Sequence, residues 1–345
     1  MVTLKEIAGV VGVSTATVSR VLNFDTTLSI TAKKRQAIIE TAEALNYATP
    51  RNRNRANAQG LSKVALVHFL RPEQELIDPY YVGLRLGIES RCQALKIETV
   101  KVYHTDSKPD ASLLQGASGV IAIGHQDDDD IEWLTRHARH VVFADFVPPS
   151  DEHDSVSSNL VTATHKLLNA LKERGYRRIG FAGWMEERSD DPYYEIRCRS
   201  YIQWMRDNLA FDPEICVTER AADRHTEQSG YRLGVRLMAA KTWPEVVVTC
   251  NDNIAIGLYR AIQDKGVSIP GDVAVASFND ISVAQFMNPP LTTIRLPAEE
   301  IGETAVELLL ERVGGRELAK RINLSSQIVW RGSTRDVPQV VEATG

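Results

Sequence analysis

The chain opens with Leu4–Asn23, LKEIAGVVGVSTATVSRVLN, a pattern that predicts two short helices joined by a tight turn. Apolar residues recur at helical spacing on both sides of Gly12, which is placed to form the turn, and Ser14 is placed to cap the second helix. The outward face of the second helix carries short polar groups and one guanidinium: Thr15, Thr17, Ser19 and Arg20. This layout is typical of a recognition helix in the major groove of DNA, with a plain helical hairpin as the alternative.

The residues that follow extend this small basic region. Thr31 is placed to cap a third helix, in which apolar residues recur at helical spacing as far as Tyr47. Residues 48–60, ATPRNRNRANAQG, hold three arginines and almost no apolar side chains, so we expect a mobile basic linker. This linker is either a solvated tether or a segment that contacts the DNA backbone or minor groove.

Charge is spread unevenly along the 345 residues, whose formal net charge is −5. The first 63 residues hold nine Lys or Arg against four Asp or Glu, whereas the remainder holds 31 against 41. A basic head on an acidic body suits a nucleic-acid contact that is confined to one end.

From Ser62 onward, apolar runs alternate with helical stretches, which predicts parallel sheets wrapped by helices. Strands are expected at Lys63–Phe69, Glu98–His104, Gly119–Gly124, His140–Asp145, Arg178–Gly183, Glu245–Cys250 and Val273–Phe278. Helices are expected at Tyr81–Leu95, Val161–Glu173, Ile196–Asn208, Asn253–Lys265 and Ala298–Val313. A run of this length is best accommodated as two doubly wound halves. Ligands of such folds bind at the carboxyl ends of strands, where Asp145, Asn251 and Asn279 with Asp280 are placed.

Several classes of protein are disfavoured by composition. The four cysteines are far apart and include no C-x-x-C pair, so neither a disulfide framework nor a zinc site is expected. We expect no metal, no cofactor and no enzymatic activity, since no phosphate-cradling glycine loop and no nucleophile–base–acid set is visible. With no apolar leader and no stretch of membrane-spanning length, the expected location is the cytoplasm, with association to the nucleoid through DNA.

These features together resemble the lactose/galactose repressor family of bacterial transcription regulators. The most specific motifs are GVS at 12–14, TVSRVLN at 17–23, LNY at 45–47, NDNIAIG at 251–257, SFND at 277–280 and PPLTTIR at 289–295. The resemblance implies an all-α helix-turn-helix headpiece followed by an α/β effector domain similar to periplasmic binding proteins, built of two doubly wound parallel-sheet subdomains. The implied divisions are a headpiece at 1–47, a hinge at 48–61, and an effector and dimerisation domain at 62–340. Its N-subdomain would hold about 62–159 and 292–324, and its C-subdomain about 160–291 and 325–340.

At the DNA end, the resemblance implies a homodimer on a pseudo-palindromic double-stranded operator, with one headpiece per half-site. Thr15 and Ala16 fall on positions that contact base edges, and Arg20 falls on an arginine that contacts guanine. Phosphate contacts are implied for Ser14, Thr17 and Asn23, although Thr17 and Asn23 could equally be solvated helix surface.

The linker departs from the family pattern. Members usually form a hinge helix that wedges a leucine into the minor groove, and Asn57 occupies that leucine position here. We therefore expect weaker kinking of the DNA, or a hinge that acts through Arg51, Arg53 and Arg55 on phosphates.

At the effector end, the resemblance implies a sugar in the cleft between the subdomains. Asp145, Arg197 and Asn251 match sugar-binding positions, and Asn279 stands where lactose-type members have an aspartate. Asp145 and Asn251 could instead cap the turns that follow them, and Arg197 could form a surface ion pair with Glu195 or Asp191. An aromatic ring stacks on the sugar in lactose-type members at the position of His225, although a loop histidine could be plain surface. Apolar walls could come from Tyr80 and Tyr81, unless these serve a subunit interface.

The function implied is a repressor of a sugar-utilisation operon that an inducer releases from its operator. Asp78-Pro79-Tyr80-Tyr81 and Asn279-Asp280-Ile281 are most similar to repressors of β-galactosidase operons, which favours a galactoside. The tail Arg335–Gly345 lacks leucine heptads, so a dimer is favoured over a tetramer. The alternatives are a corepressor-dependent regulator of the same family and a cytoplasmic sugar-binding protein without a DNA role.

Overall fold

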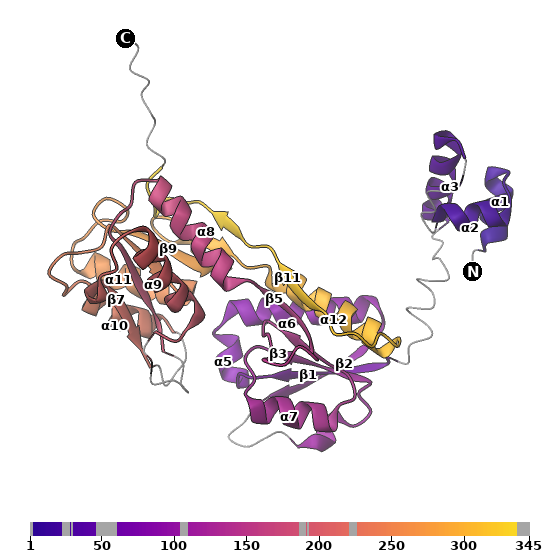
Figure 1. The fold of residues 1–345 in the computed structure, drawn as a ribbon, viewed down its shortest axis with the longest axis horizontal. Coiled ribbons are helices and arrows are strands. Elements are labelled where there is room, and N and C mark those ends of the chain that lie inside the picture. The colour runs from indigo at the N-terminus through magenta and orange to yellow at the C-terminus, as the bar shows by residue number, and fades with distance from the viewer. Residues whose placement is uncertain are drawn as a thin grey trace, which may run out of the picture. The chain divides into compact units, whose positions relative to one another are not determined.

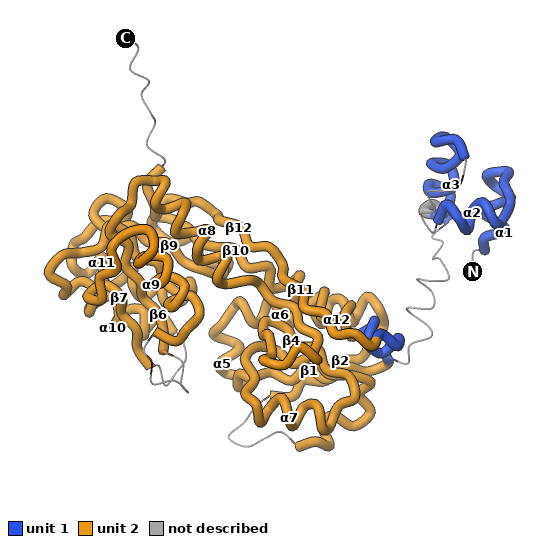
Figure 2. Tube along the Cα trace, viewed as in Figure 1, with its two compact units in different colours: residues 1–61, 310–316 blue, residues 62–309, 317–345 orange. Residues whose placement is uncertain are grey.

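The computed structural model describes residues 3–22, 28, 30–45, 61–103, 110–185, 191, 193–220 and 226–336. The chain divides into two compact units, one of residues 1–61 with 310–316 and one of residues 62–309 with 317–345 (Figure 2). Within the described residues, no helix has both the length and the apolar character that crossing a bilayer requires.

Three helices make up the described part of the first unit up to Leu45: α1 (Leu4–Val11), α2 (Thr15–Leu22) and α3 (Ala32–Ala44). Gly12 ends α1 in the left-handed conformation at φ +69°, which a glycine adopts without strain. The Ser14 hydroxyl accepts a hydrogen bond from the Thr17 amide at 3.0 Å, and Thr31 accepts one from the Lys34 amide at 3.3 Å. Both predicted caps are therefore confirmed. Buried apolar residues from all three helices form the core: Ile7, Ala8, Val18, Val21, Ile38 and Ala42.

The second unit contains two six-stranded sheets (Figure 1). The first sheet has the order β11-β5-β4-β3-β1-β2, and all its strands run parallel. Its strands are β1 (Lys63–His68), β2 (Glu98–Tyr103), β3 (Gly119–Ile123), β4 (Val141–Ala144), β5 (Asp154–Ser158) and β11 (Arg321–Leu324). Helix α7 (Asp128–His137) covers one face through Leu134, while α6 (Pro79–Ala94) and α12 (Ala298–Val313) cover the other. The short helix α5 (Pro72–Leu76) precedes α6.

The second sheet has the order β12-β10-β9-β8-β6-β7, in which only β12 runs antiparallel to its neighbour. Its strands are β6 (Ile179–Trp184), β7 (Cys216–Glu219), β8 (Val246–Thr249), β9 (Ala274–Asn279), β10 (Thr292–Arg295) and β12 (Gln327–Val329). The accompanying helices are α8 (Leu160–Glu173), α9 (Ile196–Asn208), α10 (Glu227–Leu237) and α11 (Asp252–Asp264). The two predicted doubly wound halves are confirmed.

One expected boundary is wrong. We expected residue 292 to begin a return to the first subdomain, but β10 pairs with β9 and β12 in the second sheet. The chain therefore crosses after Arg295, because the backbone of Thr292–Arg295 completes the ladder of the second sheet before α12 begins.

Helices α10 and α11 pack unusually closely, because glycines face each other at their crossing. A Cβ atom added at Gly257 would collide with the Glu227 carbonyl oxygen and meet the Tyr231 amide nitrogen at 2.5 Å. A Cβ at Gly230 would likewise collide with the Ile254 carbonyl. Backbone atoms block both positions, so a neighbouring side chain cannot relieve the clash by rotating.

We therefore expect Gly257→Ala to destabilise the second unit by about 1–3 kcal/mol, the usual cost of overpacking. Urea unfolding followed by tryptophan fluorescence would measure it, since all five tryptophans lie after residue 61. The control is Gly9→Ala in the first unit, where the new methyl group has no atom within 4 Å, and it should leave the midpoint of the second unit unchanged. An unchanged midpoint for Gly257→Ala would contradict the close packing.

Candidate functional site

The second helix of the first unit presents the predicted polar face outward. Thr15, Ala16 and Arg20 are exposed, while Val18 and Val21 on the opposite side are buried. Thr17 is half-buried, and its hydroxyl lies 2.8 Å from that of Ser14. Ser14 accepts a hydrogen bond from the Thr17 amide, and this cap fixes the position of the two hydroxyl groups. Only one of their two protons is needed for the contact between them, so the other can be donated to a further acceptor. Five other expected DNA-contacting residues lie outside the described residues: Asn23, Arg51, Arg53, Arg55 and Asn57.

In the second unit, Tyr80 and Asp145 meet although they are 65 positions apart in the chain. The Tyr80 hydroxyl donates a hydrogen bond to Asp145 Oδ1 at 2.9 Å. Asp145 directly follows β4 in the left-handed conformation, at φ +60°. Burial raises the pKa of Asp145 to about 6. Hydrogen bonds from Tyr80 and Tyr81 and the positive charge of Arg197 lower this pKa but do not offset the burial. The tyrosine that we considered for a subunit interface is therefore inside this unit, with its hydroxyl on the expected ligand-binding carboxylate.

Arg197 is only 7% exposed and is held on two sides. Its Nε donates to Glu195 Oε1 at 2.8 Å, and its Nη1 donates to the Cys250 carbonyl at 2.8 Å. The expected alternative of an ion pair with Glu195 is confirmed, but the pair is buried rather than at the surface. Burial acts to lower the pKa of Arg197, but Glu195 and its neighbours raise it on balance, so the guanidinium stays charged. Within the described residues, Nη2 has no hydrogen-bond partner.

Asn251 both caps a helix and keeps one polar group available. Its Oδ1 accepts the Ile254 amide at 2.9 Å at the start of α11, so the capping alternative is confirmed. The side-chain amide nitrogen Nδ2 has no partner in the described part of the chain. A cap leaves the amide free to donate, so capping does not compete with the expected ligand role.

Asn279 is the last residue of β9, and its backbone is left-handed at φ +110°. The loop after it is fixed by two carboxylates. Asp280 pairs with Arg295 and with Arg331, each at 2.7 Å. Asp252 is fully buried and accepts the Ile281 amide at 2.9 Å and the Thr293 hydroxyl at 2.8 Å. These contacts hold Asn279 in position at the sheet edge.

Aromatic rings also lie near Asp145 and Arg197, and of these the sequence predicted only Tyr80 and Tyr81. The Tyr81 ring lies 5.0 Å from that of Phe69 and 5.7 Å from that of His68. Trp184, the last residue of β6, has its ring centroid 4.6 Å from the Arg197 guanidinium. Trp184 was missed, although the rule that ligands bind at strand ends would have found it. His225 lies outside the described residues.

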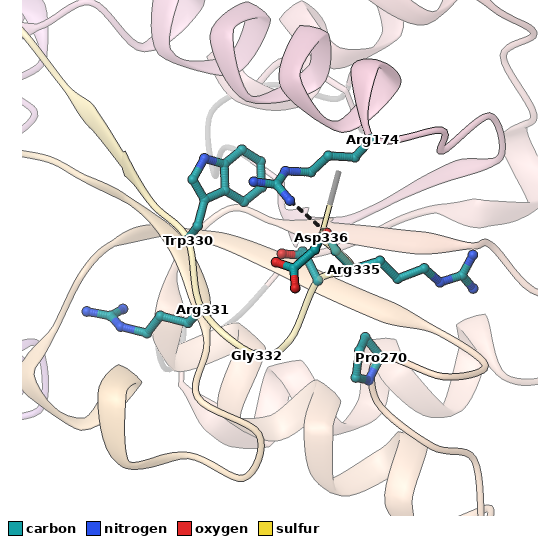
Figure 3. Close-up of a pocket in the computed structure, with 8 residues that line it drawn as sticks. Arg174, Pro270, Trp330, Arg331, Gly332, Arg335 and Asp336 are labelled. Atoms are coloured by element: carbon teal, nitrogen blue, oxygen red, sulfur yellow. Dashed lines mark hydrogen bonds between the residues drawn. The ribbon is translucent and has the colours of Figure 1, made fainter. Parts of the chain in front are cut away.

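We call the part of the second unit around the first sheet the first lobe and the part around the second sheet the second lobe. A separate cavity of about 430 Å³ lies in the second lobe. There the Arg174 guanidinium lies 3.6 Å from the Trp330 ring centroid and donates to the Arg335 carbonyl at 2.8 Å (Figure 3). The Arg331 and Arg335 side chains point in opposite directions, away from a common centre (Figure 3). None of the expected effector-binding residues lines this cavity, so it is distinct from the region around Asp145 and Arg197. Across the described residues, no group of three or more His, Cys, Asp or Glu could hold a metal ion.

Comparisons with known proteins agree with both halves of this architecture. Residues 3–50 match the model of the bacterial regulatory proteins of the lacI family, and residues 168–334 match a periplasmic binding protein-like domain. The chain is 32% identical over 341 residues to the HTH-type transcriptional repressor MelR of Bacillus subtilis (strain 168), covering 96% of this chain and 97% of that protein. It is 33% identical over 343 residues to the HTH-type transcriptional regulator GalR of Lacticaseibacillus casei, covering 97% and 100%.

A solved structure of the lac repressor dimer, bound to operator and the anti-inducer ONPF, has the same fold. It matches with a TM-score of 0.66 at 23% identity, covering 96% of this chain and 99% of that one.

A helix-turn-helix unit followed by a two-lobed parallel-sheet domain defines a DNA-binding transcriptional regulator, not an enzyme. With full-length relatives above 30% identity, the chain belongs to the lacI family of bacterial regulatory proteins. The family expected from the sequence motifs is confirmed.

Proposed function

We propose that this regulator is a homodimeric repressor of a galactoside-utilisation operon and that a galactoside releases it from a pseudo-palindromic operator. It would act in the cytoplasm, on the nucleoid. The observation that carries the effector part is that Tyr80 donates to Asp145 while the nearby charge of Arg197 acts on the same carboxylate. Arg197 Nη2 and Asn251 Nδ2 have no partner among the described residues and are available to a ligand. Homologues that regulate sugar operons support the same proposal.

The proposed ligand contacts follow from the polar atoms that remain. Asp145 accepts from sugar hydroxyls, and Arg197 Nη2 with Asn251 Nδ2 donates to them. Asn279 adds an amide, which is neutral and so forms weaker hydrogen bonds than an aspartate in that place. Tyr81 and Trp184 provide aromatic faces against which the apolar face of a sugar ring can pack. His225 belongs to the proposal on the family resemblance alone.

The proposed DNA contacts divide into two kinds. Thr15, Ala16 and Arg20 contact base edges, whereas Ser14, Thr17 and Asn23 contact phosphates. Residues 48–61 act as the hinge, and Arg51, Arg53 and Arg55 contact phosphates in place of a leucine wedge at Asn57.

The test is an operator-retardation assay with full-length protein and palindromic promoter fragments from its own genome, with and without methyl β-D-galactopyranoside, lactose or melibiose. Release of the DNA by one of these sugars, with matching heat on calorimetric titration, is the expected result. Tighter retention would instead assign a corepressor mechanism. Retardation that no sugar alters, together with no heat of binding, would overturn the effector part of the proposal.

The dimer proposal gives a prediction at the 3₁₀ helix Ser282–Phe286. Phe286 is 79% exposed and Val283 42% exposed, an apolar patch that a second copy of the chain would cover. We expect Phe286→Glu to produce monomers at micromolar concentration in analytical ultracentrifugation and to weaken operator binding at least tenfold. Leu113→Glu, at a leucine that is 47% exposed, is the control and should remain dimeric. A dimeric Phe286→Glu protein would exclude this patch from the interface.

A further inference from the structure

The segment that leads into α6 lies where the two lobes of the second unit meet. Asn253, in the first turn of α11 of the second lobe, donates its side-chain amide to the Ile77 carbonyl at 3.2 Å. Three residues further on, Tyr80 donates to Asp145 of the first lobe. Asp78 lies between Ile77 and Tyr80 in the chain, and its carboxylate is close enough to Asp145 for the two charges to interact.

Asp78 is half-buried and caps α6 by accepting the Tyr80 amide through Oδ1 at 3.2 Å. Burial raises the pKa of Asp78 to about 6, and the negative charge of Asp145 adds to the rise while Arg197 opposes it. These two carboxyl groups, which both belong to the first lobe, therefore interact electrostatically.

The cation of this region is already neutralised. Arg197 forms a buried ion pair with Glu195 at 2.8 Å. Among the described residues, neither Asp78 nor Asp145 has a cation within ion-pair distance. The region consequently carries an excess of negative charge. This charge would repel an anionic ligand, and the repulsion would be strong because the surroundings have a low dielectric constant.

We propose that Asp78 is a second ligand-facing carboxylate, and that together with Asp145 it makes the cleft accept neutral carbohydrates and reject anionic ones. Two carboxylates accept hydrogen bonds from hydroxyl groups of a neutral sugar, whereas uronic acids and sugar phosphates bring a like charge into the same space. The proposal rests on the proposed function, in which this cleft binds a carbohydrate, and adds which chemical class it excludes.

The test compares methyl β-D-galactopyranoside with galacturonic acid, which has the same ring configuration and a carboxylate at C6. In calorimetric titration, the full-length protein should bind galacturonic acid at least tenfold more weakly than it binds the neutral galactoside. Asp78→Asn removes the charge but keeps the cap, since asparagine is an equally good N-cap residue. We expect this variant to bind the galactoside up to tenfold more weakly. The ratio of its affinities for the galactoside and for galacturonic acid should fall at least fivefold below that of the wild type. Asp151→Asn, at an exposed aspartate, is the control and should keep the wild-type preference.

The preference should also depend on pH. The groups that face the pair are Tyr80, Tyr81 and Arg197, with His68 beside Tyr81 and Glu195 behind Arg197. Since both carboxyl groups lose their charge below about pH 6, the preference for the neutral sugar should be small at about pH 5 and large at about pH 8. Galacturonic acid itself stays ionised over this range.

The outcomes separate the two proposals. If the neutral galactoside binds but Asp78→Asn keeps the wild-type preference, the role of Asp78 is overturned and the sugar-responsive repressor stands. Equal affinity of the wild type for both ligands overturns the exclusion of anions in the same way. If no neutral sugar binds at all, the effector part of the proposed function fails, and this inference fails with it.

Discussion

Replacing Arg20 by alanine is expected to weaken operator binding by about 30-fold to 10⁴-fold. A guanidinium that contacts a guanine with two hydrogen bonds contributes about 1–3 kcal/mol of discrimination, and a dimer loses two such contacts. Arg20 is exposed on α2, whereas the core contacts of that helix are made by Val18 and Val21. The core of the headpiece should therefore stay intact in the variant, and circular dichroism would check its fold.

Fluorescence anisotropy with operators in which each guanine is exchanged in turn would measure this effect. Arg20→Lys keeps the charge but loses the planar fork, so it should retain phosphate attraction while losing the guanine preference. Arg136→Ala, at an exposed arginine of α7 in the second unit, is the control and should bind as the wild type does. A loss that is uniform across all operator variants would show instead that Arg20 contacts phosphate.

Replacing Arg197 by alanine is expected to abolish the response to the effector and to destabilise the second unit. Without the guanidinium, Glu195 is left as a buried carboxylate that is 2% exposed and has no cation. Removing one partner of a buried ion pair typically costs about 3–5 kcal/mol. Sugar affinity should fall at least 100-fold, since a charge-assisted donor is lost as well. A repressor that folds in this variant would stay on its operator at sugar concentrations that release the wild type.

Two further variants separate ligand binding from stability. Arg197→Met combined with Glu195→Gln removes both charges, so much of the lost stability should return while sugar binding stays absent. Arg199→Ala changes an exposed arginine two residues along the same helix and should alter neither property. Thermal unfolding and calorimetric titration provide the two measurements. Normal sugar affinity in the double variant would exclude Arg197 from the ligand contacts.

The helix-turn-helix was predictable because its signals are local. The turn at Gly12, the cap at Ser14 and the apolar spacing around Val18 each depend on neighbours within about four residues. Strands such as β1 and β8 were predictable for a similar reason, since continuous apolar runs mark strands that are covered on both faces.

Other strands were not predicted because they are buried although most of their side chains are polar. The sequence of β5 is DSVSS, yet the strand is buried throughout. Its burial is possible because Lys320 pairs with it: the Lys320 amide donates to Asp154 at 2.7 Å, and the Ser155 amide donates to the Lys320 carbonyl at 3.0 Å. A polar strand becomes stable in a core when a partner that is remote in sequence satisfies its backbone groups. The error at Thr292–Arg295 has the same origin, because its ladder partners decide which sheet it joins.

The sequence by itself determined the family, the headpiece and the strand ends at which Asp145, Asn251 and Asn279 stand, because periodicity, caps and strand termini are properties of short segments. Tertiary structure alone decided that Arg197 is balanced by Glu195, that Tyr80 donates to Asp145, and that Ile77, next to Asp78, contacts the second lobe. Charge balance and burial depend on atoms from several distant segments at once, and these properties decide which polar groups of the proposed effector site keep an atom without a partner in the protein.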